Sequence, residues 1–256
     1  MAGGHRAMAV SMAHVLVIAG SDSSGGAGVA RDVETLAAFG VKACLAITAV
    51  TVQTHDTVKS VDLCAPDLVE AQIRAAFSAN SVAAIKIGML GSCETVKRVA
   101  TVLREQAPLP VVLDPVLASS SGRALLAEDA IETMRESLMP LCSLVTPNLP
   151  ELAILTGEEE TASAADLHSQ AGHLLGGGVQ ALLVKGGHAA GARAVDTLFQ
   201  AGEPPLRFEG PRLPGTMRGT GCMLASAIAA GLARGDGLEA SVRAAKTHLS
   251  ERWLAN

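Results

Sequence analysis

The stretch Arg218-Gly219-Thr220-Gly221-Cys222 runs directly into the small, apolar segment Met223–Ala233. A segment of this composition is typical of a buried helix, and glycines just before its start leave several backbone N–H groups unpaired. Together with the helix macrodipole, those groups would form an anion hole for a transferring phosphoryl group. A cysteine there would have a depressed pKa and could react as a thiolate. The alternative is a buried cysteine at a tight turn, which these residues alone leave open.

Upstream of this stretch, short apolar runs alternate with longer amphipathic segments. We predict strands at Val15–Ala19, Ala43–Val52, Ala83–Ile87, Val111–Leu113, Leu144–Thr146 and Ala181–Val184. We predict helices at Val29–Phe39, Pro66–Ser78, Ser92–Gln106, Ala127–Leu138 and Ala164–Leu175. The strand segments are continuously apolar, which is typical of parallel strands buried on both faces between helices. Repeated strand–helix units of this kind predict an α/β fold with a doubly wound, mostly parallel sheet.

The alternation changes toward the carboxyl end of the chain. Two short apolar pieces, Ala194–Phe199 and Leu206–Phe208, flank a turn that contains two prolines, and they predict a hairpin at the sheet edge. Two predicted helices follow, at Cys222–Ala233 and Leu238–Leu254. Because the sequence contains no linker and no repeat, residues 14–256 are expected to form one domain, preceded by a disordered extension over residues 1–13.

Composition and charge narrow the class of protein. Apolar residues make up 49% of the 256 residues and aromatic residues only 2%, so the core must be built from Ala, Val, Leu and Ile. A formal net charge of −5 argues against nucleic acid or an anionic membrane surface as a partner. No run approaches the roughly 18 apolar residues of a spanning helix. The five cysteines form no CxxC pair, which indicates reduced thiols in a cytoplasmic protein.

The glycine-rich segment Gly20–Gly28 lies between the first predicted strand and the first predicted helix. Ligands of a doubly wound sheet lie at the carboxyl ends of the parallel strands, and small residues there let backbone amides approach an anion. The segment is not a Walker A loop, since Gly26 stands where that motif requires Lys, and no glycine completes a dinucleotide fingerprint after Gly28. The spacing therefore argues against a nicotinamide-dependent dehydrogenase. An ordinary strand–helix loop is the alternative to an anion-binding loop.

Polar residues also follow the next predicted strands. Lys86 lies inside an apolar run, where its long side chain could simply extend to the surface, and Met89 is a core residue more often than a ligand contact. Asp114 follows the fourth strand. A carboxylate at the end of a buried strand is costly unless it is paired, hydrogen-bonded or near a metal, or caps the next turn.

Two further segments have both a structural and a functional interpretation. In Thr146–Glu151, Asn148 and Glu151 are spaced as a capping box at a helix start, and their oxygens are also of the kind that holds Mg²⁺. In Lys185-Gly186-Gly187-His188, the lysine could reach a polyphosphate, or it could be a surface lysine before a turn.

These motifs occur in the order and spacing of a known family. The chain closely resembles the hydroxymethylpyrimidine and phosphomethylpyrimidine kinases of thiamine biosynthesis, within the ribokinase superfamily. The resemblance runs from about His14 to Leu254 and is most specific at Ala19–Gly28, Lys86–Leu90, Thr146–Glu151, Lys185–His188 and Gly219–Cys222. It implies a ribokinase-like fold, a homodimer, and two ATP-dependent steps, on the hydroxymethyl group and then on the resulting monophosphate.

The resemblance also implies a substrate pocket and a phosphoryl-transfer site. Gln53 would hydrogen-bond the aminopyrimidine edge, because a side-chain amide offers both a donor and an acceptor. The same pocket would be lined by Gly20, Ala27, Asp32, Met89 and Val116. Mg²⁺ would be held by Asn148, Glu151 and Asp114, and ATP would contact Lys185 and Thr220. The catalytic anion hole would be formed by Gly219, Thr220, Gly221 and Cys222, with Cys222 either taking the substrate proton or shaping the hole.

The chain departs from the family pattern beside this hole and in the ring pocket. Arg218 and Met223 replace the His and Thr that usually flank Gly-Thr-Gly-Cys, and Gln53-Thr54-His55 replaces Gln-Asn-Thr. Arg218 could add a cation near the phosphates.

Two other functions are compatible with parts of the pattern. A pyridoxal or pyridoxine kinase of the same lineage, or a dual activity, would share Gly-Thr-Gly-Cys and differ mainly in the ring pocket, where Gln53 and Met89 favour the pyrimidine. A non-catalytic pyrimidine-binding domain would be expected to lack Lys185, Glu151 or Cys222, and all three are present.

Overall fold

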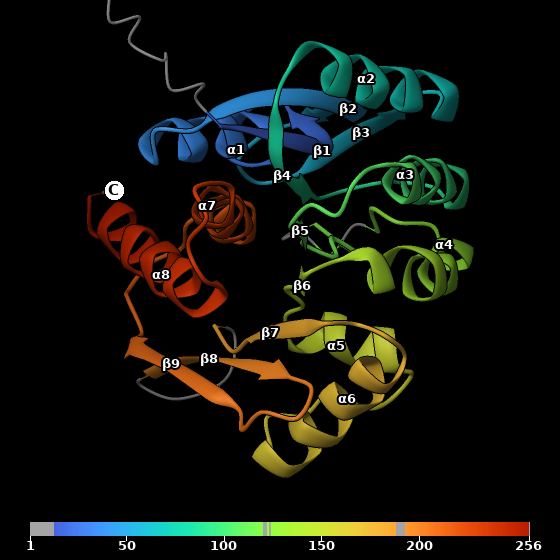
Figure 1. The fold of residues 1–256 in the computed structure, drawn as a ribbon. Helices are drawn as coiled ribbons and strands as arrows, with labels where there is room; N and C mark the ends of the chain where they lie inside the picture. Colours follow the sequence, from blue (N-terminus) through green and yellow to red (C-terminus); the bar gives the residue numbers. More distant parts are fainter. Residues whose placement is uncertain (1–12, 120–121, 123, 188–192, 256) are drawn as a thin grey trace, which may run out of the picture.

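The computed structural model describes residues 13–119, 122, 124–187 and 193–255. Within them, nine strands form one sheet in the order β3-β2-β1-β4-β5-β6-β7-β8-β9 (Figure 1). The strands are β1 (His14–Asp22), β2 (Lys42–Gln53), β3 (Val58–Leu63), β4 (Val82–Ile87), β5 (Val111–Leu113), β6 (Leu144–Val145), β7 (Ala181–Lys185), β8 (Arg193–Gln200) and β9 (Leu206–Pro211).

Helices separate most of the strands along the chain. They are α1 (Gly28–Ala38), α2 (Pro66–Ala79), α3 (Cys93–Glu105), α4 (Glu128–Thr133), α5 (Leu149–Thr156), α6 (Ala164–Gly176), α7 (Thr220–Ala233) and α8 (Leu238–Leu254). A π-helical turn at Met134–Leu138 and a 3₁₀ turn at Met139–Leu141 continue α4.

The strand order reverses at β1, which lies between β2 and β4. The pairs from β2 across to β7 are parallel, whereas β3 at one edge and the β8–β9 hairpin at the other are antiparallel. The predicted doubly wound, mostly parallel sheet with an edge hairpin is therefore confirmed. In such a sheet a crevice forms beyond the carboxyl ends of the strands where the order reverses. The loop Gly20–Gly28 follows β1 at that point.

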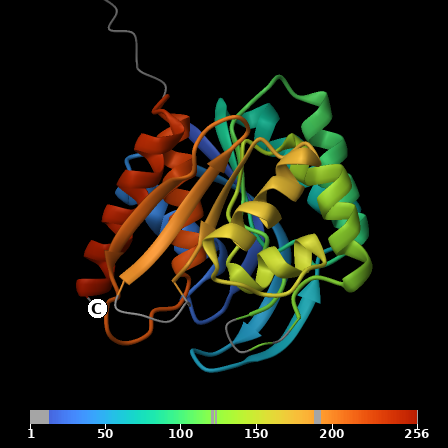
Figure 2. The ribbon, with the colours of Figure 1, turned by 90° about the horizontal axis from the view of Figure 1, so that it is seen from below.

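Helices cover both faces of the sheet (Figures 1 and 2). α1, α7 and α8 pack on one face, and α2 to α6 pack on the other. Along β1, Val15 and Val17 face the first helical layer, and Leu16 and Ile18 face the second; all four are fully buried. This two-sided burial explains the continuous apolar pattern of the strand.

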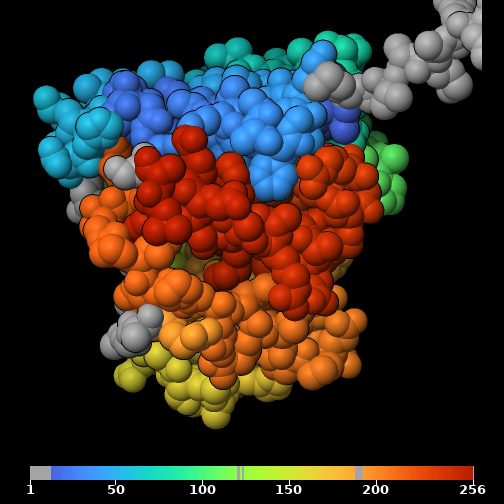
Figure 3. Space-filling model, turned by 90° about the vertical axis from the view of Figure 1, so that its left-hand side faces the viewer, coloured from blue at the N-terminus to red at the C-terminus, as the bar shows by residue number. Residues whose placement is uncertain are grey.

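Helix α8 lies between α1 and the β8–β9 hairpin (Figure 3). Its His248 ring meets Phe39, at the end of α1, with 5.1 Å between ring centroids. On the other side, the Arg243 guanidinium lies 5.2 Å from the ring centroid of Phe208 in β9. These contacts bind the hairpin and the first helix to the same layer.

Two elements of the sheet differ from the prediction. The carboxyl-terminal half of β2 is not buried on both faces, because the side chains of Val50 and Val52 are 53% and 50% exposed. β3, which pairs with this half, is not among the predicted strands, since its sequence Val58–Leu63 is half polar and has neither a continuous apolar run nor a regular alternation. One helix was also predicted only in part. The sequence indicated the first turn of α5 but not its full length, because the helix is short and mostly apolar and so has no amphipathic periodicity.

Two sequence expectations fall outside the described residues: the extension over residues 1–13, apart from Ala13, and the position of His188. Within the described part of the chain, no helix is long and apolar enough to cross a membrane.

Candidate active site

The start of α7 lies against the loop that follows β1. Gly219 is the N-cap of α7, and its φ of +70° is a left-handed conformation that favours glycine. A Cβ at this position would collide with the carbonyl oxygen of Gly26 and lie 3.1 Å from the Cα of Ala27. The first intrahelical bond runs from Met223 N to Gly219 O at 2.9 Å, so the N–H groups of residues 220–222 precede it. These N–H groups belong to the residues predicted from the sequence to form an anion hole.

Lys185 and Asp114 lie beside this end of α7. A Cβ on Gly221 would be 3.0 Å from Asp114 Oδ2 and 3.4 Å from Lys185 Nζ. Lys185, the last residue of β7, donates a hydrogen bond of 2.7 Å to Asp114 Oδ1 after β5. Burial lowers the pKa of Lys185, but the carboxylates of Asp114 and Glu151 raise it above its ordinary value, so the ammonium stays charged. The sheet thus assembles three predicted site residues from distant parts of the chain.

Glu151 is the second carboxylate near this ammonium. Its Oε2 lies 3.9 Å from Lys185 Nζ. The capping box is confirmed: Asn148 N donates to Glu151 Oε2, and Glu151 N donates to Asn148 Oδ1, both at 2.8 Å. The pKa of Glu151 is raised to about 7, mainly because burial disfavours its charged form; the charge of Lys185 opposes this effect, and that of Asp114 adds to it. The cap therefore aims a desolvated carboxylate at the site.

A fully buried ion pair lies beneath the anion hole. Lys86 Nζ in β4 lies 2.9 Å from Asp32 Oδ2 in α1, and both side chains are 0% exposed. Ser226 in α7 donates to Asp32 Oδ1 at 2.7 Å. Burial lowers the pKa of Lys86, but the nearby carboxylate of Asp32 raises it well above its usual range and keeps it charged.

Two expectations are corrected by this pair. Lys86 does not extend to the surface, because its ammonium has a carboxylate partner inside the protein. Asp32 does not face the substrate pocket, since it is fully buried and its two oxygens are bonded to Lys86 and Ser226. Its contacts join α1 to β4 and α7. The polar Ser226 inside an otherwise apolar helix was the sequence signal for this contact.

Cys222 also differs from expectation. Burial raises the pKa of its thiol to about 11, and the nearby charge of Lys86 and a hydrogen bond with the backbone of Gly28 only partly oppose this. The helix N-terminus therefore does not produce the depressed pKa that the sequence suggested. Desolvation outweighs the favourable field, and the thiol is protonated at neutral pH.

The predicted ring-pocket residues come from four segments, at or after the carboxyl ends of the neighbouring strands β2, β1, β4 and β5. A Cβ on Gly20 would lie 3.2 Å from Met89 Sδ, so these two positions are in contact. Gln53 ends β2, and its backbone is joined to Ser23 by two hydrogen bonds of 2.8 and 2.9 Å. Ala27 adjoins Gly219, as described above, and Val116 is half-buried two residues after Asp114.

Sequence reasoning missed the partners of Arg218. Its Nη2 donates to Asp22 Oδ2 at 3.1 Å, and its Nη1 donates to Ser24 Oγ at 2.8 Å and to the carbonyl of Thr54 at 2.9 Å. Asp22 is buried, and a buried carboxylate inside the Gly20–Gly28 loop was the available signal that a cation faces it.

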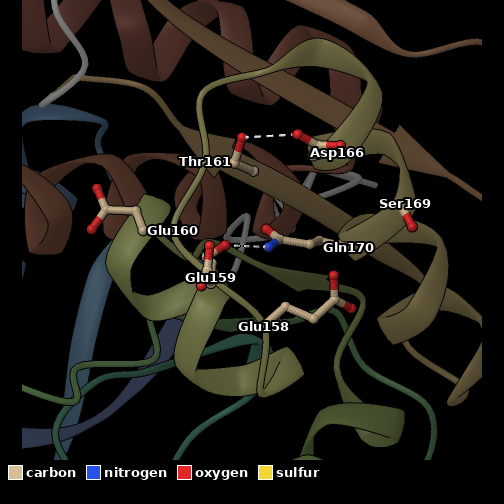
Figure 4. Close-up of a pocket in the computed structure, with 7 residues that line it drawn as sticks. All are labelled: Glu158, Glu159, Glu160, Thr161, Asp166, Ser169 and Gln170. Carbon is tan, nitrogen blue, oxygen red and sulfur yellow. Dashed lines mark hydrogen bonds between the residues drawn. The ribbon is translucent and has the colours of Figure 1, made fainter.

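An acidic hollow of about 310 Å³ lies away from these residues, around the α5–α6 connection (Figure 4). Its lining includes Glu158, Glu159, Glu160 and Asp166. Its polar groups are bonded to one another, with Gln170 Nε2 donating to Glu159 O at 2.8 Å. Four carboxylates would repel phosphates, so this hollow is not part of the phosphoryl-transfer site.

The fold and this site together define a small-molecule kinase of the ribokinase-like class. One similar structure is that of the pyridoxal kinase from Staphylococcus aureus in complex with AMP-PCP and pyridoxal, with a TM-score of 0.85, 30% identity, and coverage of 94% of this chain and 87% of that chain. The chain belongs to the phosphomethylpyrimidine kinase family, whose model matches residues 22–254.

Two relatives show how far this similarity extends. The chain is 43% identical over 235 residues to the hydroxymethylpyrimidine/phosphomethylpyrimidine kinase of Rhizobium meliloti, covering 91% of this chain and 88% of that one. Its fold also matches the crystal structure of phosphomethylpyrimidine kinase from Clostridium difficile 630, with a TM-score of 0.81 and 34% sequence identity. The match covers 94% of this chain and 99% of that chain. The family expected from the motifs is confirmed.

Replacing Lys86 with Met should strongly destabilise the fold, because it leaves the buried Asp32 carboxylate without its cation. We expect the free energy of unfolding in urea to fall by about 3–5 kcal/mol, and the double variant Lys86→Met/Asp32→Leu to recover most of it. Arg74→Met, which removes an exposed ion pair with Glu105, is the control and should change stability far less. A Lys86→Met variant as stable as the wild type would contradict the importance of the pair.

Proposed function

We propose that this kinase transfers the γ-phosphoryl group of ATP to 4-amino-5-hydroxymethyl-2-methylpyrimidine, and then to its monophosphate, in thiamine biosynthesis. The observation that carries the proposal is the position of Gly221, whose Cβ would lie 3.0 Å from Asp114 Oδ2 and 3.4 Å from Lys185 Nζ. An anion hole, an ammonium and a carboxylate thus meet at one point, as phosphoryl transfer requires. The relatives with these two kinase activities in their names support the substrate.

The ammonium of Lys185 is assigned to the ATP phosphates, together with the start of α7. It lies between Asp114 and Glu151, which keep it charged. The backbone N–H groups of residues 220–222 would stabilise the negative charge that spreads over the transferring oxygens. Such a site acts mainly by positioning and by fixed charge, and it needs little covalent chemistry.

Asp114, Glu151 and Asn148 are assigned to Mg²⁺. Their oxygens are the hard donors that this ion prefers. Over the described ranges 13–119, 122, 124–187 and 193–255, no three His, Cys, Asp or Glu side chains gather as a complete ligand set. This fits an ion held by one or two carboxylates together with water and nucleotide phosphates. Mg²⁺ would neutralise charge on those phosphates.

The pyrimidine is assigned to the pocket between β1, β2 and β4. Gln53 would pair with the amino edge of the ring, and Gly20, Ala27, Met89 and Val116 would form the walls. Gly20 leaves room because any side chain there would press on Met89. Asp32 would support this pocket indirectly, by its ion pair with Lys86 and its hydrogen bond with Ser226.

Purified protein with Mg-ATP should release ADP when given the hydroxymethylpyrimidine, and again when given its monophosphate. The two rates can be measured with a coupled ADP assay, with pyridoxal as the competing substrate. Turnover of pyridoxal with neither pyrimidine accepted would overturn the substrate assignment and leave the fold and the kinase chemistry intact.

We assign the substrate proton to the minor fraction of Cys222 that is ionised, since most of the thiol is protonated at neutral pH. Cys222→Ala should therefore lower kcat by about 10²-fold while the pyrimidine still binds. Because the thiol pKa is raised to about 11, the thiolate fraction increases roughly tenfold per pH unit between about pH 7 and 9. The wild-type kcat should rise over that range, and the kcat of Cys222→Ala should not. Near-normal turnover in the variant would instead limit Cys222 to shaping the anion hole.

Three further assignments concern the whole protein. One continuous sheet with helices on both faces supports a single kinase domain over residues 14–256. Its five cysteines are free thiols, which supports a cytoplasmic location. Four large apolar side chains of β2 and β3 are 39–53% exposed, at Leu45, Val50, Val52 and Leu63, and they support a homodimer through this edge.

The double variant Val50→Lys/Val52→Lys should convert the dimer into a monomer, because it places charges in the apolar contact. Light scattering after size-exclusion chromatography measures the mass. Ile154→Lys is the matched control, since Ile154 is 50% exposed but lies on α5, and this variant should remain dimeric. A wild-type monomer, or a double variant that is still dimeric, would refute this interface.

A further inference from the structure

Arg218 joins three segments at the mouth of the site. It directly precedes Gly219, the N-cap of α7. Its guanidinium donates to Asp22 and Ser24 in the loop after β1 and to the carbonyl of Thr54 in the turn after β2. Its side chain is 20% exposed, and that of Asp22 is 3% exposed. The charged group is thus held in a fixed, largely desolvated position.

This position lies between the two halves of the proposed site. On one side, Arg218 is adjacent in sequence to the anion hole. On the other, it is bonded to Thr54, the neighbour of the ring-reading residue Gln53. The group that is phosphorylated must span the same interval, because its carbon is attached to the ring and its oxygen must reach the transferring phosphoryl group. In the first substrate this group is a neutral hydroxymethyl; in the second it is a phosphate dianion.

The other buried cations of the site are already assigned. Lys86 is fully buried against Asp32, and Lys185 is bonded to Asp114 next to the start of α7. Arg218 is the cation that also contacts the turn next to Gln53, through the carbonyl of Thr54. Asp22 Oδ1 accepts from both Ser24 N and Ser24 Oγ at 2.8 Å, so Asp22 keeps two hydrogen bonds if the guanidinium turns away. A guanidinium binds phosphate oxygens as a bidentate pair, which makes this exchange favourable.

We propose that Arg218 binds the phosphate of the monophosphate substrate by exchanging Asp22 for a phosphate oxygen, and thereby sets the balance between the two phosphorylation steps. This inference rests on the proposed function. Asp22 competes with the phosphate for the guanidinium and holds it in place until the second substrate enters. Arg218 is accordingly a specificity-determining residue for the second step.

Two substitutions with opposite expected effects test this role. In Arg218→Gln the KM for the monophosphate should rise at least tenfold more than the KM for the hydroxymethylpyrimidine, because only the former carries the charge that is lost. In Asp22→Asn the competing carboxylate is removed, so the KM for the monophosphate should fall or stay the same. Arg218→Lys keeps the positive charge but cannot form a bidentate pair with phosphate, so its KM for the monophosphate should be intermediate. Arg234→Gln, at the exposed end of α7, is the control and should leave both substrates unchanged.

The outcome separates this role from a structural one. If Arg218 only ties the loops together, Arg218→Gln and Asp22→Asn break the same ion pair and should impair both substrates in parallel, which would overturn the proposal. Calorimetric binding of the monophosphate to each variant, with unfolding curves as a check on folding, keeps the test valid for a weakened protein. A wild type that phosphorylates neither pyrimidine would refute the proposed function itself, and this result is distinct from a loss of selectivity.

Discussion

The buried ion pair of Lys86 and Asp32 is the interaction on which the site depends. It joins β4 to α1, and through Ser226 it joins both to α7. Taking two charges out of water is costly, so the pair persists only because its geometry is close and Ser226 completes the bonding. Gly88 contributes to that geometry, since a Cβ there would lie only 3.0 Å from Lys86 Nζ. The pair thereby ties β4 and α1 to α7, whose first turn carries the proposed anion hole.

Close approach of backbones is the second constraint. Gly219 and Gly28 both have positive φ. A side chain at Gly219 would collide with the carbonyl of Gly26 in the facing loop, and one at Gly28 with the carbonyl of Gly20 within that loop. Gly28 thus keeps the loop after β1 compact, and Gly219 allows it to lie directly on the start of α7, where the strand order reverses. The sheet reversal brings these two segments together, and the proposed phosphate contacts use the backbone N–H groups at the start of α7.

Charge in the site is arranged as cations that already have carboxylate partners. Lys185 is bonded to Asp114, and Arg218 to Asp22, and both cations lie beside the start of α7. A phosphate group that enters would compete with a carboxylate oxygen for each cation, and a displaced Asp22 would keep its hydrogen bonds from Ser24. The arrangement explains how a protein of net charge −5 can bind polyanions through local groups.

The sequence by itself determined the alternation of strands and helices, the edge hairpin and the places where ligand contacts gather, because these follow from periodicity and from glycine and proline positions. It also contained the motifs that identify the family. Only the tertiary structure decided the partners: Lys86 turned inward because Asp32 meets it across 54 positions, and the Cys222 pKa rose because burial outweighed the helix field. β3 and the partners of Arg218 were likewise hidden, since an edge strand and an ion pair across 196 positions depend on contacts that no local pattern contains.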